Sequence, residues 1–287
     1  WLLAVRPRTL TAAAAPVLAG TGLAAFHGVA AAGPALAALL GALLIQVATN
    51  LANDYYDFVH GGDTEERIGP VRVTQAGILT PAAVRRGMLA ALGAALLVGA
   101  YLVAAGGWPV VVIGLASLVC AVAYTGGPYP LAYHGLGDVF VFVFFGVVAV
   151  GGTVWVQGLV WPPDAVLAGV AMGALSTAIL VVNNLRDLDT DRKAGKRTLA
   201  VRLGARGTKV EYVALLAMAL LAPWVGVARF AWPPASLAAL LVLPLCLTPL
   251  RRVVGYAHPA ELLPALGETA RMVAVYGMLL ALGLALG

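Results

Sequence analysis

Long apolar runs follow one another along almost the whole chain, and short segments with Gly, Pro and charged residues separate them. A membrane-spanning helix needs about 20 mostly apolar residues, and Gly and Pro commonly mark the ends of such helices. The pattern therefore predicts an all-α, multi-pass membrane protein that forms a single domain, 1–287. The nine predicted membrane-spanning helices are 10–27, 34–57, 82–105, 108–124, 137–158, 164–186, 208–228, 234–250 and 268–286.

The composition agrees with this class and excludes several others. Hydrophobic residues make up 61% of the chain and charged residues 11%, whereas soluble domains carry about 25% charged residues. The two cysteines, Cys120 and Cys246, both lie in apolar runs, which argues against a disulfide framework. The sequence shows no nucleotide-binding loop and no Ser/His/Asp arrangement.

Positive charge is distributed unevenly about the predicted helices. All of the 18 Lys and Arg residues except Arg229 lie on the side that holds the N-terminus and the loops after the second, fourth, sixth and eighth helices. The positive-inside rule assigns that side to the cytoplasm, so we expect a cytoplasmic N-terminus and a location in the cell membrane. The net charge of +5 is then first a topology signal, and an anionic partner at the cytoplasmic surface is the second interpretation.

The second predicted helix ends in an acidic segment, QVATNLANDYYDFVHGGDTEERIGPVR, at residues 46–72. At about 100° per residue, Asn50, Asp54 and Asp57 fall within roughly 60° of one another on one helical face. Gln46 lies one turn earlier on this face, where it could line a substrate cavity. Ionisable residues are costly within a membrane, so such a face indicates a functional site.

The sixth predicted helix ends in a similar way, with the segment NNLRDLDTD. Asn183, Asp187 and Asp191 are four residues apart and share one helical face. Asn50 and Asp54 repeat the spacing of Asn183 and Asp187, and both motifs close a predicted helix on the cytoplasmic side. This similarity predicts two degenerate pseudo-repeats whose acidic helix ends face one cavity. The two motifs are at 50–63 and 183–191.

The chemistry of these helix ends follows from their charge. Carboxylates at helix C-termini meet the negative end of the helix dipole, so they require cations. Oxygen ligands without His or Cys favour Mg²⁺, which often completes its shell with substrate phosphates. We therefore expect a magnesium-bound diphosphate with a lipid tail, and cations that stabilise the leaving diphosphate. The expected metal-binding and catalytic residues are Asp54, Asp57, Asp187 and Asp191, and the expected diphosphate-binding residues are Asn50, Asn183, Arg67, Arg72, Lys196 and Arg197.

Both Asp-rich segments, NDYYDFVHGGD and NNLRDLDTD, resemble the two motifs of the UbiA superfamily of intramembrane aromatic prenyltransferases. Three longer segments resemble its 1,4-dihydroxy-2-naphthoate prenyltransferases, which act in the menaquinone pathway. These segments are RPRTLTAAAAPVLAGTGLA, NDYYDFVHGGDTEERIGPVRVTQAGILTP and YTGGPYPLAYHGLGDVFVFVFFG. The resemblance covers nearly the whole chain.

The resemblance implies a bundle of nine helices around a central cavity, capped on the cytoplasmic side and open laterally to lipid. It also implies that Mg²⁺ bridges both Asp motifs to a polyprenyl diphosphate. The allylic carbon would join the naphthoate ring at the position bearing the carboxylate, with loss of carbon dioxide, to give demethylmenaquinol. Asp63 would be a further metal ligand, displaced from the superfamily position because His60, Gly61 and Gly62 lengthen the loop. We expect a Lys after YTGGP in many relatives, where this chain has Tyr129.

Other polar residues are candidates for contact with the acceptor. Tyr124 and Tyr133 flank the loop after the fourth predicted helix, where substrate contact and interface anchoring are both open. Asp138 opens the fifth predicted helix, a position that suits capping and acceptor binding equally. Arg6 and Arg8 are favoured as topology anchors over binders of an acceptor carboxylate. The acceptor candidates are thus Gln46, Tyr124, Tyr133 and Asp138.

Three functions remain open from the sequence. The leading hypothesis is prenyl transfer to 1,4-dihydroxy-2-naphthoate. A second keeps the chemistry and changes the acceptor to 4-hydroxybenzoate, homogentisate, a chlorophyllide or a glycerol-phosphate lipid. The third is a cation or lipid-phosphate transporter, which would place charges in the middle of several helices. The acidic residues instead lie at cytoplasmic helix ends, with only Asp164 near the opposite face, and this argues against a transport path.

Overall fold

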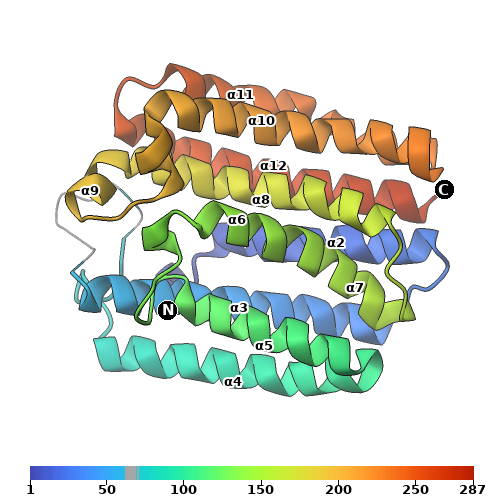
Figure 1. Cartoon of the computed structure of the whole chain (residues 1–287), viewed down its shortest axis with the longest axis horizontal. Coiled ribbons are helices and arrows are strands. Elements are labelled where there is room, and N and C mark those ends of the chain that lie inside the picture. Colours follow the sequence, from blue (N-terminus) through green and yellow to red (C-terminus); the bar gives the residue numbers. More distant parts are fainter. Residues whose placement is uncertain (62–68, 70) are drawn as a thin grey trace.

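A computed structural model of the chain describes residues 1–61, 69 and 71–287, and this part is helical without a β-strand. The long helices run side by side along the long axis of the molecule (Figure 1). The elements in chain order are α1 (Leu2–Val5), α2 (Pro7–Phe26), α3 (Ala32–Val59), α4 (Pro81–Gly106), α5 (Trp108–Ala123), η1 (Ala132–His134), α6 (Gly137–Phe142), η2 (Val143–Val148), α7 (Ala149–Gly158), α8 (Asp164–Arg186), α9 (Leu188–Lys193), α10 (Leu199–Phe230), η3 (Pro234–Val242), α11 (Leu243–Gly255), η4 (Pro259–Glu261) and α12 (Leu262–Ala285).

Within the described residues, eight helical segments are long and apolar enough to cross a membrane. The other apolar helix, α5, has 16 residues and is shorter than these segments. The prediction of an all-α, multi-pass membrane protein is therefore confirmed. The eight segments are Pro7–Phe26, Ala32–Val59, Pro81–Gly106, Gly137–Gly158, Asp164–Arg186, Leu199–Phe230, Pro234–Gly255 and Pro259–Ala285.

The predicted helix boundaries differ most at α10 and α12, which begin before the predicted positions 208 and 268. The hydroxyl of Thr198 caps α10 by accepting a hydrogen bond from the backbone N–H of Val201. The chain then kinks at Gly204, whose φ of 68° favours glycine. Because the first turns of α10 carry charged residues, a search for apolar runs does not detect them.

α8 is the central helix of the bundle, and most of its residues are buried. It packs against α10, α12, α6 and η2, and Figure 1 shows it between α6 and the α10–α11 pair. Gly173 of α8 approaches α6 so closely that a Cβ there would collide with the carbonyl oxygen of Phe142. Small residues allow such close helix packing in membranes, so this contact fixes α8 against the segment from α6 to α7.

A smaller buried cluster joins α1, α3 and α4 to the segment that follows residue 70, and it contains Leu51, Val73 and Val84. α3 and α8 end at the same end of the bundle, where α9 and the loop between α5 and α6 also lie (Figure 1). The fold therefore brings both Asp-rich helix ends to one end of the molecule.

Candidate active site

The ends of α3 and α8 contribute to a polar cavity of about 220 Å³. α9 and the segments around Arg72 and Lys196 complete its wall. Residues from both Asp-rich segments therefore line one space. The predicted residues that line it are Gln46, Asn50, Asp57, Arg72, Tyr124, Tyr133, Asn183, Asp187, Asp191 and Lys196.

Asp57 is a buried carboxylate of this cavity and is 2% exposed. It accepts hydrogen bonds from Arg72 Nη2 at 2.7 Å, Tyr133 Oη at 2.8 Å and Lys196 Nζ at 3.3 Å. Lys196 Nζ also lies 3.9 Å from Asp191 Oδ1 and 4.7 Å from the ring centre of Tyr133. The ammonium of Lys196 thus links the carboxylates of the two Asp motifs.

Asp187 is held by its sequence neighbour, Arg186. The guanidinium donates to both carboxylate oxygens of Asp187, at 2.8 and 2.6 Å, and to Asn183 Oδ1 at 2.8 Å. The Arg186 side chain is fully buried, and a bidentate pair of this kind is geometrically specific. From the sequence, Arg186 was interpreted only as one of the positive charges that set the membrane topology. In the structure it fixes the orientation of Asp187, a predicted metal ligand.

Asp54 has different surroundings, although it lies only three residues from Asp57 on α3. Its Oδ2 and Oδ1 accept hydrogen bonds from the backbone N–H groups of Val73 and Thr74, at 3.1 and 3.0 Å. Arg6 Nη2 lies 3.7 Å from Asp54 Oδ2. Asp54 is 1% exposed and is absent from the described residues that line the polar cavity. Its carboxylate therefore lies behind the cavity wall.

Asn50 connects the N-terminal helices to α3. Its amide nitrogen donates to the carbonyl oxygen of Val5 at 2.8 Å and to Thr9 Oγ1 at 2.9 Å. Its amide oxygen accepts a hydrogen bond from Gln46 Nε2 at 3.3 Å. Asn50 lines the cavity, but its hydrogen-bonding groups already hold neighbouring helices in place.

Asn53 is a lining residue that sequence reasoning missed. Its amide oxygen accepts a hydrogen bond from Thr125 Oγ1 at 2.9 Å. A signal for it was present, because Asn53 precedes Asp57 by the same four-residue spacing that separates Asn183 from Asp187. Arg6, which the sequence favoured as a topology anchor, also lines the cavity. Further lining residues with no comparable signal are Thr9, Thr49, Thr125, Ser176, Asn184 and Thr190.

Several other predicted residues lie away from the cavity or outside the described part of the chain. The side chain of Arg197 is exposed and does not line the cavity. Asp138 is buried at the start of α6 and is not among the described residues that line the cavity. Asp63 and Arg67 lie outside the residues that the structure describes.

Tyr129, at the position where a Lys was expected, stacks on His134 with 3.5 Å between ring centres and is exposed. Tyr129 does not line the polar cavity, whose described lining residues include the cations Arg72 and Lys196. Tyr124 remains at the cavity, where it lines the wall.

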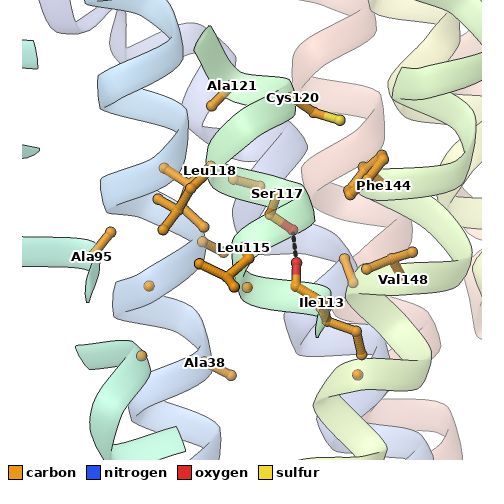
Figure 2. A pocket seen from close by; sticks show the side chains of 18 of the residues that line it. Ala38, Ala95, Ile113, Leu115, Ser117, Leu118, Cys120, Ala121, Phe144 and Val148 are labelled. Carbon is orange, nitrogen blue, oxygen red and sulfur yellow. Dashed lines mark hydrogen bonds between the residues drawn. The ribbon is translucent and has the colours of Figure 1, made fainter. Parts of the chain in front are cut away.

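A second cavity of about 400 Å³ adjoins the polar one and is lined mainly by apolar side chains of α2 to α5, η2 and α7. The two cavities share Gln46, Thr49 and Tyr124 in their walls. Figure 2 shows Leu115 and Leu118 on one side of α5 and Phe144 and Val148 on its other side, all among the residues that line this space. The combined space has a polar head and an apolar body, which suits an amphiphilic ligand. The one hydroxyl labelled there, on Ser117, donates within its own helix to the carbonyl oxygen of Ile113 at 2.7 Å.

The donor set suits a magnesium ion that shares its ligands with a substrate. Asp57, Asp187 and Asp191 offer oxygen atoms to the polar cavity, and Mg²⁺ takes one or two carboxylates with substrate phosphates. Among the described residues, no group of three Asp, Glu, His or Cys side chains could hold a metal ion. A dedicated all-protein site is therefore not evident in this part of the chain, whereas a substrate-bridged one fits.

Comparison with known proteins gives a consistent result. A family model described as the UbiA prenyltransferase family matches residues 13–285. A 1,4-dihydroxy-2-naphthoate octaprenyltransferase of Mycobacterium tuberculosis is 39% identical over 100% of this chain and 97% of its own length. The Escherichia coli protein of the same name is 36% identical over 99% of this chain and 94% of its own length.

The fold is also similar to that of a UbiA homologue from Archaeoglobus fulgidus whose structure was solved bound to DMAPP and Mg²⁺. The TM-score is 0.64 at 16% sequence identity, and the match covers 97% of this chain and 98% of the other. This likeness shows a shared fold.

Proposed function

The chain belongs to the UbiA prenyltransferase family, and on that premise we propose that it prenylates 1,4-dihydroxy-2-naphthoate. The polyprenyl group would come from a polyprenyl diphosphate, and diphosphate and carbon dioxide would leave, giving demethylmenaquinol. One observation carries the proposal: a polar cavity lined by both Asp motifs shares part of its wall with an apolar cavity of about 400 Å³. The names of the full-length relatives support naphthoate as the acceptor.

The polar cavity would hold the diphosphate. Asp57, Asp187 and Asp191 would bind magnesium, which on binding neutralises the diphosphate and improves it as a leaving group. Asp63 is proposed as a further ligand and lies outside the described residues. Asp54 does not line the polar cavity, and its oxygens accept hydrogen bonds from backbone N–H groups behind it, so we do not place it among the ligands.

The cations of the cavity would bind phosphate oxygens. Arg72 and Lys196 now pair with Asp57, and both side chains reach the cavity. Charge-assisted hydrogen bonds from such groups stabilise the charge that develops as the allylic carbon–oxygen bond breaks. Asn183 lines the same space and would supply a further contact, while Arg67 is proposed for this role from the sequence alone.

The acceptor would lie where the two cavities meet. Gln46 and Tyr124 line both cavities. Gln46 Oε1 and Ser176 Oγ are buried and have no hydrogen-bond partner in the described part of the protein. Hydroxyl groups of an aromatic acceptor would satisfy these atoms, because buried polar groups are normally hydrogen-bonded. The prenyl tail would extend into the apolar cavity and exclude water from the reacting carbon.

We further propose a single domain of two pseudo-repeats, with nine membrane crossings in the cell membrane. The N-terminus and the polar cavity would face the cytoplasm. The support is the charge distribution, since all Lys and Arg residues except Arg229 lie on one side of the predicted helices. A cap over the cavity would be formed by α9 and the loop before α6, which lie at that end of the bundle (Figure 1).

An acceptor panel tests the proposed function. Purified protein receives Mg²⁺, a labelled polyprenyl diphosphate and one acceptor at a time: 1,4-dihydroxy-2-naphthoate, 4-hydroxybenzoate, homogentisate, a chlorophyllide or a glycerol-phosphate lipid. The expected result is prenylation of the naphthoate alone. If another acceptor were prenylated and the naphthoate were not, the naphthoate assignment would be wrong and the assignment as a prenyltransferase would stand.

A further inference from the structure

Asp54 holds a compact turn formed by residues 72–78. In this turn the carbonyl oxygen of Arg72 accepts a hydrogen bond from Ala76 N at 2.9 Å, and that of Val73 accepts one from Ile78 N at 2.9 Å. The first N–H groups of such a helical turn have no acceptor within it. The two carboxylate oxygens of Asp54 supply acceptors to the N–H groups of Val73 and Thr74.

The turn is also anchored by apolar packing. Val73 is fully buried beside Leu51 and Val84, in the cluster that joins α1, α3 and α4. Thr74 is 4% exposed. Since this segment has no long helix of its own, its position depends on this cluster and on the two charge-assisted bonds to Asp54.

Arg72 immediately precedes the two residues that Asp54 holds. Its guanidinium lines the polar cavity and donates to Asp57 Oδ2 at 2.7 Å. Asp54 and Asp57 both lie on α3. Asp54 lies behind the cavity wall and binds the backbone of Val73 and Thr74, whereas Asp57 lies in the wall and binds the side chain of Arg72. A displacement of the Val73 and Thr74 backbone would withdraw Arg72 from the cavity.

We propose that Asp54 is a positioning residue that places Arg72 for binding the diphosphate, and that it does not bind the metal. The inference rests on the proposed function and assigns a distinct role to one carboxylate of the first Asp motif. Asp54 does not line the polar cavity. Turning its carboxylate toward a metal there would take it away from two buried backbone N–H groups, and buried donors without acceptors are strongly disfavoured. Its contact with Arg6 at 3.7 Å is longer than either of the two bonds from backbone N–H groups.

A binding experiment separates positioning from metal ligation. Geranyl diphosphate is titrated calorimetrically into purified protein at saturating Mg²⁺. Mg²⁺ is then titrated at a geranyl diphosphate concentration that saturates each variant. The variants are Asp54→Ala, Asp54→Asn, Arg72→Gln and the double variant Asp54→Ala/Arg72→Gln, with Asp187→Ala as the control for a lost metal ligand. Size-exclusion chromatography and thermal unfolding verify that each variant is folded.

Asp54→Ala should weaken geranyl diphosphate binding by about 10- to 100-fold, as Arg72→Gln does, because both remove one charge-assisted contact. Asp54→Asn keeps one acceptor oxygen and should fall between Asp54→Ala and the unaltered protein. When Asp54→Ala is added to Arg72→Gln, geranyl diphosphate binding should weaken by less than about threefold beyond the Arg72→Gln variant, since the effects of coupled residues are not additive. The Mg²⁺ midpoint should stay within about threefold in the Asp54 variants and rise at least about tenfold in Asp187→Ala.

Hydrogen exchange gives a readout that is independent of any ligand. In Asp54→Ala, the amides of Val73 and Thr74 should exchange at least about tenfold faster, whereas those of α8 should be unchanged. A Mg²⁺ midpoint that rises in Asp54→Ala as it does in Asp187→Ala would overturn the inference. The inference would also be overturned if Asp54→Ala weakened geranyl diphosphate binding as much in the Arg72→Gln background as it does in the unaltered protein. If the unaltered protein binds no geranyl diphosphate, the proposed function fails and the inference fails with it.

Discussion

Replacing Lys196 by Met tests the electrostatics of the polar cavity. Met keeps a flexible chain of similar length and removes the ammonium. That ammonium lies 3.3 Å from Asp57 Oδ1 and 3.9 Å from Asp191 Oδ1, and the side chain is 12% exposed. Asp57 would keep its bonds from Arg72 and Tyr133, so the fold should persist while the cavity loses one positive charge.

The magnitude follows from the contact that Lys196 would make with a phosphate oxygen. A hydrogen bond to a charged group contributes about 1.5–3 kcal/mol. Each 1.4 kcal/mol corresponds to about tenfold in binding, and so the KM for the polyprenyl diphosphate should rise about 10- to 100-fold. The KM for the naphthoate should change by less than about threefold, because the ammonium contacts carboxylates of the diphosphate end of the cavity.

The chain offers a matched control in Lys209. Its ammonium lies 4.4 Å from the ring centre of Tyr256, much as that of Lys196 lies 4.7 Å from the ring centre of Tyr133. Lys209 donates to the carbonyl oxygen of Val254 and does not line the polar cavity. Steady-state kinetics in detergent would compare the two Met variants. A polyprenyl diphosphate KM unchanged in Lys196→Met, or raised equally in Lys209→Met, would refute the reasoning.

Three further substitutions test other parts of the structure. Asp187→Asn removes a negative charge from the cavity and should lower turnover at least about 1000-fold while the protein remains folded in membranes, as activity and size-exclusion chromatography would show. Val148→Trp narrows the apolar cavity, so the KM for a long polyprenyl diphosphate should rise about tenfold and that for geranyl diphosphate should not. Asp164→Asn weakens the hydrogen bonds from Trp232 Nε1 at 2.8 Å and His27 Nε2 at 3.0 Å. Thermal unfolding should show that the free energy of unfolding falls by about 1–3 kcal/mol, while turnover per folded molecule stays normal. Equal KM changes for both substrates, or lower turnover in Asp164→Asn, would contradict these expectations.

The helices were predictable because lipid and protein core both select apolar residues, so each long apolar run marks a helix whatever it packs against. The same logic predicted Asp57, Asp187 and Asp191, which line the polar cavity, since a carboxylate at the end of an apolar helix is costly without a function. It failed at the polar first turns of α10, where tertiary contacts and the Thr198 cap stabilise a helix without an apolar run.

The roles within the Asp motifs were not predictable from spacing. Asn50, Asp54 and Asp57 share a broad helical face, and the sequence does not mark where the cavity wall crosses it. The structure places Asp57 in the cavity and Asp54 behind it. That division depends on the Val73–Thr74 turn, which comes from elsewhere in the chain. The role of Arg186 likewise depends on its side-chain direction, which spacing does not determine.

Carbon dioxide release tests the central claim most directly. Purified protein would receive Mg²⁺, a polyprenyl diphosphate and 1,4-dihydroxy-2-naphthoate labelled in its carboxylate carbon. The proposed reaction predicts labelled carbon dioxide in equal amount to the prenylated product, with both abolished in Asp187→Asn. A prenylated product that retains the label, or no prenylation of the naphthoate at all, would contradict it.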